Sequence, residues 1–199
     1  MTKTIGIVLY PNFEELDAVG PYEVLAMLAK IDPEWRVVTI AEQAGPVRAF
    51  SGLQLVADHG FDDAPALDVI LLPGGLGSRR EMDNPRMLDY VRAAGNSAEW
   101  VTSVCTGAMI LHRAGFLDGR KATTHWGAIY ELRNLGGCEV LEDARWVEDG
   151  NVITSAGVSA GIDMPLYLVS LLKDPTAAKN VQKMMEYYPK PPTFEEARL

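Results

Sequence analysis

The fold can be argued from one heptapeptide, Val101-Thr102-Ser103-Val104-Cys105-Thr106-Gly107. An apolar, β-branched run ends at the cysteine, and a helix-like segment begins directly after it. Small residues stand two before and two after Cys105, which is the pattern of a nucleophile elbow, where a strand turns sharply into a helix. We therefore expect Cys105 in a strained turn at a helix N-terminus, where the helix dipole favours the thiolate. The alternative is a buried cysteine that fills a strand end.

Strand-like and helical patterns alternate on both sides of this elbow. Nearly continuous apolar strands are expected at residues 5–10, 35–41, 68–72, 100–104 and 151–155. Helices are expected at residues 22–31, 85–94 and 160–172. Strands that are apolar throughout indicate a sheet covered on both faces, and alternation of strands with helices indicates parallel pairing. The sequence thus predicts an α/β fold with a doubly wound, mostly parallel sheet and helices on both faces.

Three segments depart from this alternation. Residues 43–58 contain short strand-like pieces around Gly45-Pro46 and Ser51-Gly52, which predict a small hairpin or an excursion at the sheet edge. Residues 138–154 have a similar pattern. The tail from Pro189 is expected to be an extended strap over the surface. Since no repeat or linker divides the chain, we expect a single domain over residues 1–199.

Composition narrows the possible partners and compartment. The chain has 199 residues, a net charge of −9 and two cysteines. The negative charge argues against nucleic acid or an anionic membrane surface as a partner. Two cysteines do not make a disulfide framework, and the N-terminus lacks a signal-peptide pattern. No apolar run reaches the ~20 residues that span a bilayer. We expect a cytoplasmic protein that binds neither nucleic acid nor membrane.

Carboxylates follow the first expected strand. In an open α/β sheet, sites form at the carboxyl ends of the strands, so this segment is a candidate. Glu14 and Glu15 are expected to be solvated, since acidic residues are favoured near a helix start. Asp17 differs because Leu16 and Ala18 flank it, which suggests a partly buried carboxyl. Burial raises the pKa of a carboxyl and suits Asp17 to proton transfer beside a thiol.

A glycine-rich loop, residues 73–77, follows the strand at residues 68–72. Gly74 and Gly75 allow close backbone approach to a ligand and are expected to leave N–H groups unpaired. Together with the Thr106 N–H, these groups would form a pocket that stabilises an anion. The alternative is an ordinary turn.

Other candidate side chains are His125, which follows Thr123-Thr124, and the remaining cysteine. His125 is interpreted either as a partner or base near the thiol, or as a structural cap of the next helix. His59 and His112 are expected to be structural, and Cys138 is expected to be a core residue. No cluster has the spacing of metal ligands, so no metal site is expected.

At these residues the chain resembles the ThiJ/PfpI superfamily, whose fold is similar to class I glutamine amidotransferase domains and is flavodoxin-like. Within it, the chain is most similar to the isonitrile hydratases. Four segments of their pattern occur here in order, at residues 16–21 (Leu-Asp-x-x-Gly-Pro), 101–107 (Val-Thr-Ser-Val-Cys-Thr-Gly), 122–126 (Ala-Thr-Thr-His-Trp) and 160–163 (Ala-Gly-Ile-Asp).

The resemblance implies a cofactor-independent lyase that acts on a small molecule. Cys105 would attack the terminal carbon of an isonitrile, R–N≡C. Asp17 would move the protons, and Thr106 would orient the acid or the substrate. Hydrolysis of the resulting thioimidate would give an N-substituted formamide. The residues that the resemblance places around the substrate are Gly75, Leu76, His125 and Val158.

Two other functions remain open at this point. One is a redox or metabolite sensor, since regulators of the AraC type carry a similar domain and an exposed thiol of low pKa oxidises readily. The other is a glyoxalase-type stress protein on the same fold. Asp17 and Thr106 favour the hydratase, because the protease-like branch often has histidine after the cysteine. The resemblance also implies a homodimer.

Overall fold

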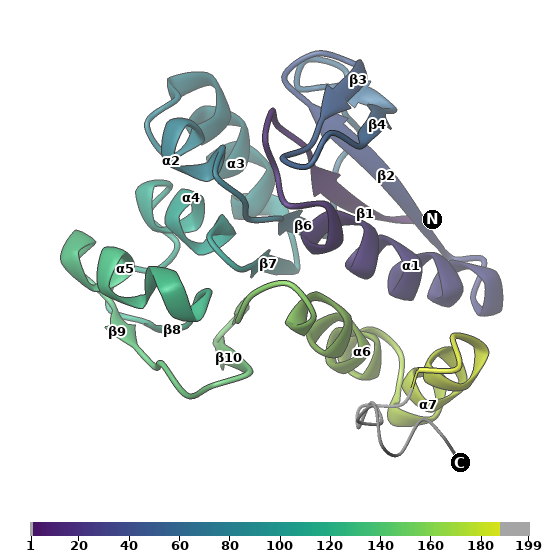
Figure 1. The fold of residues 1–199 in the computed structure, drawn as a ribbon. Helices are drawn as coiled ribbons and strands as arrows, with labels where there is room; N and C mark the ends of the chain where they lie inside the picture. The colour runs from purple at the N-terminus through teal and green to yellow at the C-terminus, as the bar shows by residue number, and fades with distance from the viewer. Residues whose placement is uncertain (1, 188–199) are drawn as a thin grey trace.

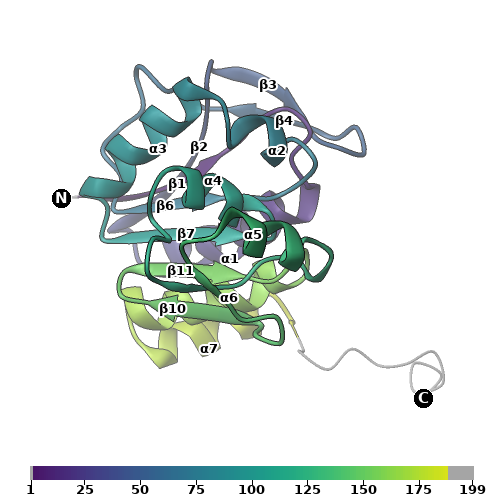
Figure 2. The ribbon, with the colours of Figure 1, turned by 90° about the vertical axis from the view of Figure 1, so that its left-hand side faces the viewer.

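A seven-stranded sheet organises the computed structural model, which describes residues 2–187 (Figure 1). The strand order is β10-β11-β7-β6-β1-β2-β5, and only β10 runs antiparallel to its neighbour. The strand bounds are β1 Lys3–Val8, β2 Trp35–Ala41, β5 His59–Gly60, β6 Val69–Leu72, β7 Trp100–Val104, β10 Trp146–Asp149 and β11 Val152–Ser155. Figure 2 shows β2, β1, β6, β7, β11 and β10 in succession across the sheet.

Two small two-stranded sheets flank the central one. The antiparallel hairpin of β3 (Gly45–Arg48) and β4 (Gln54–Ala57) confirms the hairpin predicted within residues 43–58. The second pair, β8 (Lys121–Ala122) and β9 (Glu139–Val140), is parallel.

Helices cover both faces of the central sheet. On one face α1, α6 and α7 pack against one another, and on the other α3 and α4 contact β6, with α2 and α5 beside α4 (Figure 1). The helix bounds are α1 Glu15–Ile31, α2 Ser78–Glu81, α3 Pro85–Ser97, α4 Gly107–Arg113, η1 Trp126–Ala128 (a 3₁₀ turn), α5 Ile129–Leu135, α6 Ala160–Leu172 and α7 Pro175–Met184. All four residues of β6 are fully buried, as expected for a strand with both faces covered. The predicted doubly wound, flavodoxin-like α/β fold is confirmed.

The first helix is longer than predicted. It begins at Glu15 rather than at Tyr22, so Pro21 lies inside it. The Gly20-Pro21 pair resembles a helix break, since proline lacks the N–H that a helix interior requires. Tertiary packing overrides this local preference, because Ala18, Val24 and neighbouring residues bury one face of α1 in the core. The extension places Asp17 in the first helical turn.

Several short elements did not emerge from the sequence pattern. These are α2, α5 and α7, although α7 carries a start signal: the Asp174 side chain accepts a hydrogen bond from the Ala177 N–H, and Pro175 is the first helical residue. The strands and helix predicted at residues 35–41, 100–104 and 160–172 have the predicted bounds. The strap predicted from Pro189 lies outside the described residues.

The sheet order concentrates strand ends at one place. The chain leaves β1 toward β2 on one side and later returns to β6 on the other, so the direction of the fold reverses between β1 and β6. Ligand sites of open α/β sheets lie at such a reversal, outside the carboxyl ends of the strands. Four adjacent strands, β11, β7, β6 and β1, end there. Within residues 2–187, no helix combines the length and the apolar character needed to cross a bilayer.

Candidate active site

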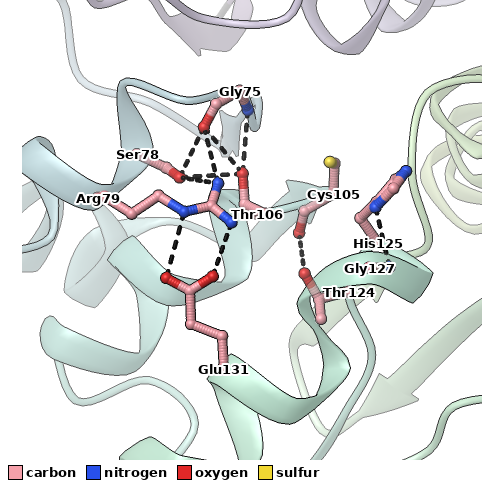
Figure 3. Close-up of polar contacts among 9 residues, drawn as sticks. All are labelled: Gly75, Ser78, Arg79, Cys105, Thr106, Thr124, His125, Gly127 and Glu131. Atoms are coloured by element: carbon pink, nitrogen blue, oxygen red, sulfur yellow. Dashed lines mark hydrogen bonds and ion pairs between the residues drawn. The ribbon is translucent and has the colours of Figure 1, made fainter.

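Cys105 occupies the sharp turn between β7 and α4 that the sequence predicts. Its backbone φ is +56°, a left-handed conformation that L-residues other than glycine seldom adopt. The turn is fixed from both sides, since the Cys105 N–H donates to the Ser155 carbonyl (3.0 Å) and its carbonyl accepts from the Thr124 hydroxyl (2.7 Å; Figure 3). At Gly107 a Cβ would collide with the Leu72 carbonyl oxygen, which explains the small residue after the cysteine.

Asp17 lies beside the thiol and is completely buried. Its two carboxylate oxygens accept backbone N–H groups from separate loops: Oδ2 from Gly74 and Oδ1 from Val158, both at 3.0 Å. Asp17 also lies against the Cys105 side chain, since a Cβ placed on Gly74 would lie 2.7 Å from Cys105 Cβ and 2.8 Å from Asp17 Oδ2. Because α1, the loop after β6 and the loop after β11 all hold it, Asp17 is fixed in one orientation toward the sulfur.

Val158 supplies one of these N–H groups from a strained backbone. Its φ is +53°, which is a genuine outlier for a β-branched residue. Such strain persists only where the surrounding structure enforces it, and it is common at functional sites. Here it aims the Val158 N–H at Asp17. The sequence analysis placed Val158 around the substrate only by resemblance; its contact with the acid was not predicted.

Burial shifts the pKa of both reactive groups upward. The pKa of Asp17 rises to about 7, chiefly through loss of solvent, while its interactions with the Cys105 side chain and the Gly74 N–H act in the opposite direction. The pKa of Cys105 rises to about 12, again through burial and then through the charge of Asp17. The expectation that the helix dipole makes Cys105 a thiolate is therefore wrong. The Thr106 N–H does lower the pKa, but burial and a neighbouring carboxylate outweigh it.

The Gly74–Gly75 loop is anchored rather than open. The Gly74 N–H donates to Asp17, and the Gly75 N–H donates to the Thr106 hydroxyl at 3.0 Å. The prediction that these N–H groups are unpaired is therefore wrong: the site's own side chains use both. The Thr106 hydroxyl also lies 3.1 Å from the Gly75 carbonyl oxygen and 2.9 Å from Ser78 Oγ (Figure 3). Thr106 thus holds the loop against the elbow. Its hydroxyl contacts this loop and not Asp17, the acid that it was expected to orient.

Arg79 links the same loop to α5. Its guanidinium binds both carboxylate oxygens of Glu131, at 3.2 and 2.7 Å, and donates to the Gly75 carbonyl at 3.3 Å (Figure 3). The sequence analysis missed this pair, because 52 residues separate its members and neither sits in a motif.

A cavity of about 380 Å³ opens above the Cys105 sulfur. Its lining residues come from six segments, and they are Glu14, Phe50, Gly75, Leu76, Arg79, Cys105, Thr106, His125, Trp126, Gly127, Ala128 and Val158. The structure thus brings Gly75, Leu76, His125 and Val158 together around Cys105, while Asp17 lies behind it. Trp126, Leu76 and Phe50 are 82%, 59% and 52% exposed, so the rim is apolar.

Two sequence interpretations change at this cavity. Glu14 was expected to be solvated but is half-buried and lines the cavity. His125 caps η1, because its Nδ1 accepts the Gly127 N–H at 3.1 Å (Figure 3). It also lines the cavity, and its role as a partner or base of the thiol stays a prediction. Glu15 accepts from the Ser51 N–H at 2.6 Å and does not line the cavity.

The remaining histidines and the second cysteine lie elsewhere. His112 contacts the Gly136 carbonyl oxygen at 2.7 Å, and His59 lies 3.8 Å from Asp63. Cys138 is half-buried and packs against the core. In the described part of the chain, no three or more His, Cys, Asp or Glu side chains are grouped so that they could hold a metal ion.

Replacing Gly74 by alanine is expected to disrupt this arrangement. The added Cβ would lie 2.5 Å from the Thr106 nitrogen, 2.7 Å from Cys105 Cβ and 2.8 Å from Asp17 Oδ2. Relief requires movement of backbone, so we expect the free energy of unfolding to fall by about 2 kcal/mol in urea titrations. The control is Gly20→Ala, whose Cβ would lie 3.3 Å from the flexible Ile162 side chain and 3.4 Å from the Gly161 carbonyl oxygen, which is close to ordinary contact distance. Equal stabilities for the two variants would contradict the packing argument.

Comparisons with known proteins give one family and a mixed set of relatives. The DJ-1/PfpI family model matches residues 3–171. An isonitrile hydratase from Pseudomonas putida is 42% identical over 96% of this chain and 82% of that protein. The transcriptional regulator GbdR from Pseudomonas aeruginosa, a helix-turn-helix type, is 30% identical over 84% of this chain but only 46% of its own length. A crystal structure of a ThiJ/PfpI family protein from Pseudomonas syringae superposes with a TM-score of 0.89, at 35% identity, over 98% of this chain and 78% of that one.

Proposed function

The chain belongs to the DJ-1/PfpI family, and from that premise we propose that it is an isonitrile hydratase, which adds water to R–N≡C to give an N-substituted formamide. The observation that carries the proposal is the position of the buried Asp17 carboxylate directly behind Cys105, whose thiol lines a cavity with an apolar rim. Similarity to the Pseudomonas putida isonitrile hydratase supports the choice of substrate class.

The first chemical step uses the proton that Cys105 and Asp17 share. At a pH above the Asp17 pKa of about 7, the carboxylate is charged and the sulfur holds its proton. Asp17 takes the thiol proton as the sulfur forms a bond to the terminal carbon of the isonitrile. Asp17 then delivers that proton to the same carbon, which gives a thioimidate, R–N=CH–S–Cys. A soft sulfur nucleophile and a nearby proton donor suffice for this addition.

The second step returns the enzyme to its starting state. Asp17, again a carboxylate, accepts a proton from water as the oxygen adds to the thioimidate carbon, and it passes that proton to the nitrogen. Collapse of the adduct breaks the C–S bond, and the hydroxyl proton returns through Asp17 to the sulfur. The balance is one isonitrile and one water consumed for each formamide released. Thr106 acts here as a positioning residue, which holds Gly75 against the elbow.

The alternative role as a redox sensor loses its chemical basis at this site. It was expected for an exposed thiol of low pKa, whereas Cys105 is 6% exposed and its pKa is raised. The glyoxalase-type alternative remains a prediction. The homodimer and the cytoplasmic location also belong to this proposal; they rest on the family resemblance and on the cysteine content.

The direct test is conversion of a simple alkyl isonitrile by the purified chain in ¹⁸O-labelled water. We expect steady release of the N-alkyl formamide, detected by mass spectrometry, with the label in its carbonyl. Consumption of one isonitrile per chain, with no formamide released, would show that Cys105 forms the thioimidate but that the thioimidate is not hydrolysed. A lack of any formamide would reject the proposed function.

The pH profile gives a second measurement. Protonated Asp17 cannot accept the thiol proton, so activity requires its ionised form. Since the pKa of Asp17 is about 7, kcat/KM is expected to fall about tenfold per pH unit below pH 7 and to level off above it. The rates are measured with an uncharged isonitrile from about pH 5 to about pH 9. A profile that is flat through pH 7, or one that falls as the pH rises, would contradict the assigned role of Asp17.

A further inference from the structure

We propose that Glu14 sets a charge preference in the cavity above Cys105, so that cationic reactants are favoured over neutral ones and anionic reactants are disfavoured. For isonitriles, the inference rests on the proposed function. The expected substrates are isonitriles whose R group has an apolar body and no negative charge. Among them, those that also carry an ammonium group are preferred.

The position of Glu14 follows from the start of α1. Glu14 is the residue before the helix, and its side chain makes no capping hydrogen bond. Its backbone is fixed, because its N–H donates to the Gly74 carbonyl at 2.8 Å. The side chain is half-buried and lines the same cavity as the thiol. A carboxylate that neither caps its helix nor lies in open solvent is left facing the space that a reactant must enter.

The charges around the cavity do not cancel. Arg79 is the lining residue with a permanent positive charge, and the two-point contact with Glu131 neutralises it. Within residues 2–187, no Lys, Arg or His nitrogen lies within 4.0 Å of the Glu14 carboxylate. His125 also lines the cavity, and its Nδ1 accepts the Gly127 N–H rather than contacting Glu14. The net field in the cavity is therefore negative.

The rest of the rim suits an organic cation with an apolar body. Phe50 and Trp126 line the same cavity as Glu14, and both residues are largely exposed. Aromatic faces attract ammonium groups and also tolerate uncharged apolar groups. They offer nothing to a carboxylate or sulfonate, which would meet the Glu14 charge without compensation. The aromatic rim and the carboxylate thus select in the same direction.

Charged thiol reagents test this preference without isonitrile chemistry. In a Cys138→Ser background, Cys105 is the sole cysteine, and its labelling rates with trimethylammonioethyl and sulfonatoethyl methanethiosulfonate are compared. Both reagents react with the same sulfur, and they differ in the sign of their charge. Their rate ratio therefore cancels any change in the intrinsic reactivity of the thiol. Removing one partly screened charge with Glu14→Gln is expected to lower the cation-to-anion ratio about fivefold.

The matched control is Glu15→Gln, which removes the same charge from the adjacent residue outside the cavity lining. We expect the ratio for this variant to stay within about twofold of the parent. An equal fall in both variants would show that overall charge, not Glu14, sets the preference and would overturn the proposal. An unchanged ratio in Glu14→Gln would also overturn it.

Isonitrile turnover then separates this inference from the proposed function. Ammonium- and carboxylate-bearing isonitriles of similar size are compared with an uncharged one. We expect Glu14→Gln to reduce the difference in kcat/KM between the cationic and the anionic isonitriles. If no isonitrile is converted, the proposed function fails, while the labelling ratio still decides the role of Glu14. If turnover occurs but the labelling ratio and the kcat/KM difference do not respond to Glu14→Gln, the charge preference fails alone.

Discussion

Formamide formation is expected to fall at least about 1000-fold when Cys105 is replaced by alanine, because no other group at the cavity floor can form the bond to the isonitrile carbon. The fold should survive the change. Alanine keeps the Cβ, and the turn at φ +56° is held by main-chain contacts to Ser155 and Thr124. Urea titration should therefore give a free energy of unfolding within about 1 kcal/mol of the parent.

A matched substitution separates this effect from a general loss of thiols. Cys138→Ser removes the other cysteine, which is half-buried and packs against the core away from the cavity lining. We expect it to retain full turnover. Residual activity of Cys105→Ala within tenfold of the parent would show that water attacks without a covalent intermediate, and the mechanism would have to be abandoned.

The elbow and the acid could be predicted because their signals are local. A β-branched strand, a cysteine and small residues at fixed spacing specify the strained turn without reference to the rest of the fold. Asp17 was singled out by its apolar neighbours, although in the fold its carboxylate is enclosed by the loops after β6 and β11. The βα alternation likewise specifies a parallel sheet, and the sheet then dictates that the strand ends converge.

The missed features depend on contacts that no local pattern carries. Arg79 and Glu131 meet only because two short helices, α2 and α5, lie on either side of α4. The Val158 N–H reaches Asp17 only through a backbone conformation that valine disfavours. Glu14 has the same local sequence context as a solvated residue at a helix start, and only the cavity distinguishes it.

The thiol pKa shows how tertiary structure reverses a local expectation. An elbow places any cysteine at a helix N-terminus, which by itself favours the thiolate. In this fold the elbow also points the sulfur at a buried carboxyl, and a second negative charge beside Asp17 is unfavourable. The pair therefore keeps one proton above pH 7. In the proposed mechanism, that proton is consumed by the addition to R–N≡C and restored by the hydrolysis.

Asp17→Asn is expected to reduce turnover about 100- to 1000-fold while making the thiol easier to ionise. The two effects have one cause. The Asp17 charge helps to raise the pKa of Cys105, so its removal lowers that pKa and leaves more thiolate at neutral pH. Asparagine cannot take the thiol proton and deliver it to carbon, so the addition stalls although the nucleophile is more available.

Loss of proton transfer alone is expected to change the alkylation rate of Cys105 and the kcat/KM for isonitrile in opposite directions. Alkylation of Cys105 by iodoacetamide at pH 7 should be faster in Asp17→Asn than in the parent, while kcat/KM for an uncharged isonitrile falls. Asparagine has one acceptor oxygen for the two N–H groups, from Gly74 and Val158, that the carboxylate accepts, so some stability is lost as well. A loosened site could also speed alkylation by exposing the thiol, so the alkylation rate is measured against pH: a lower thiol pKa shifts the midpoint of that profile, whereas exposure raises the rate at high pH. If both rates fall in parallel, Asp17 serves only to hold the loops, and the proton must reach the substrate from another group.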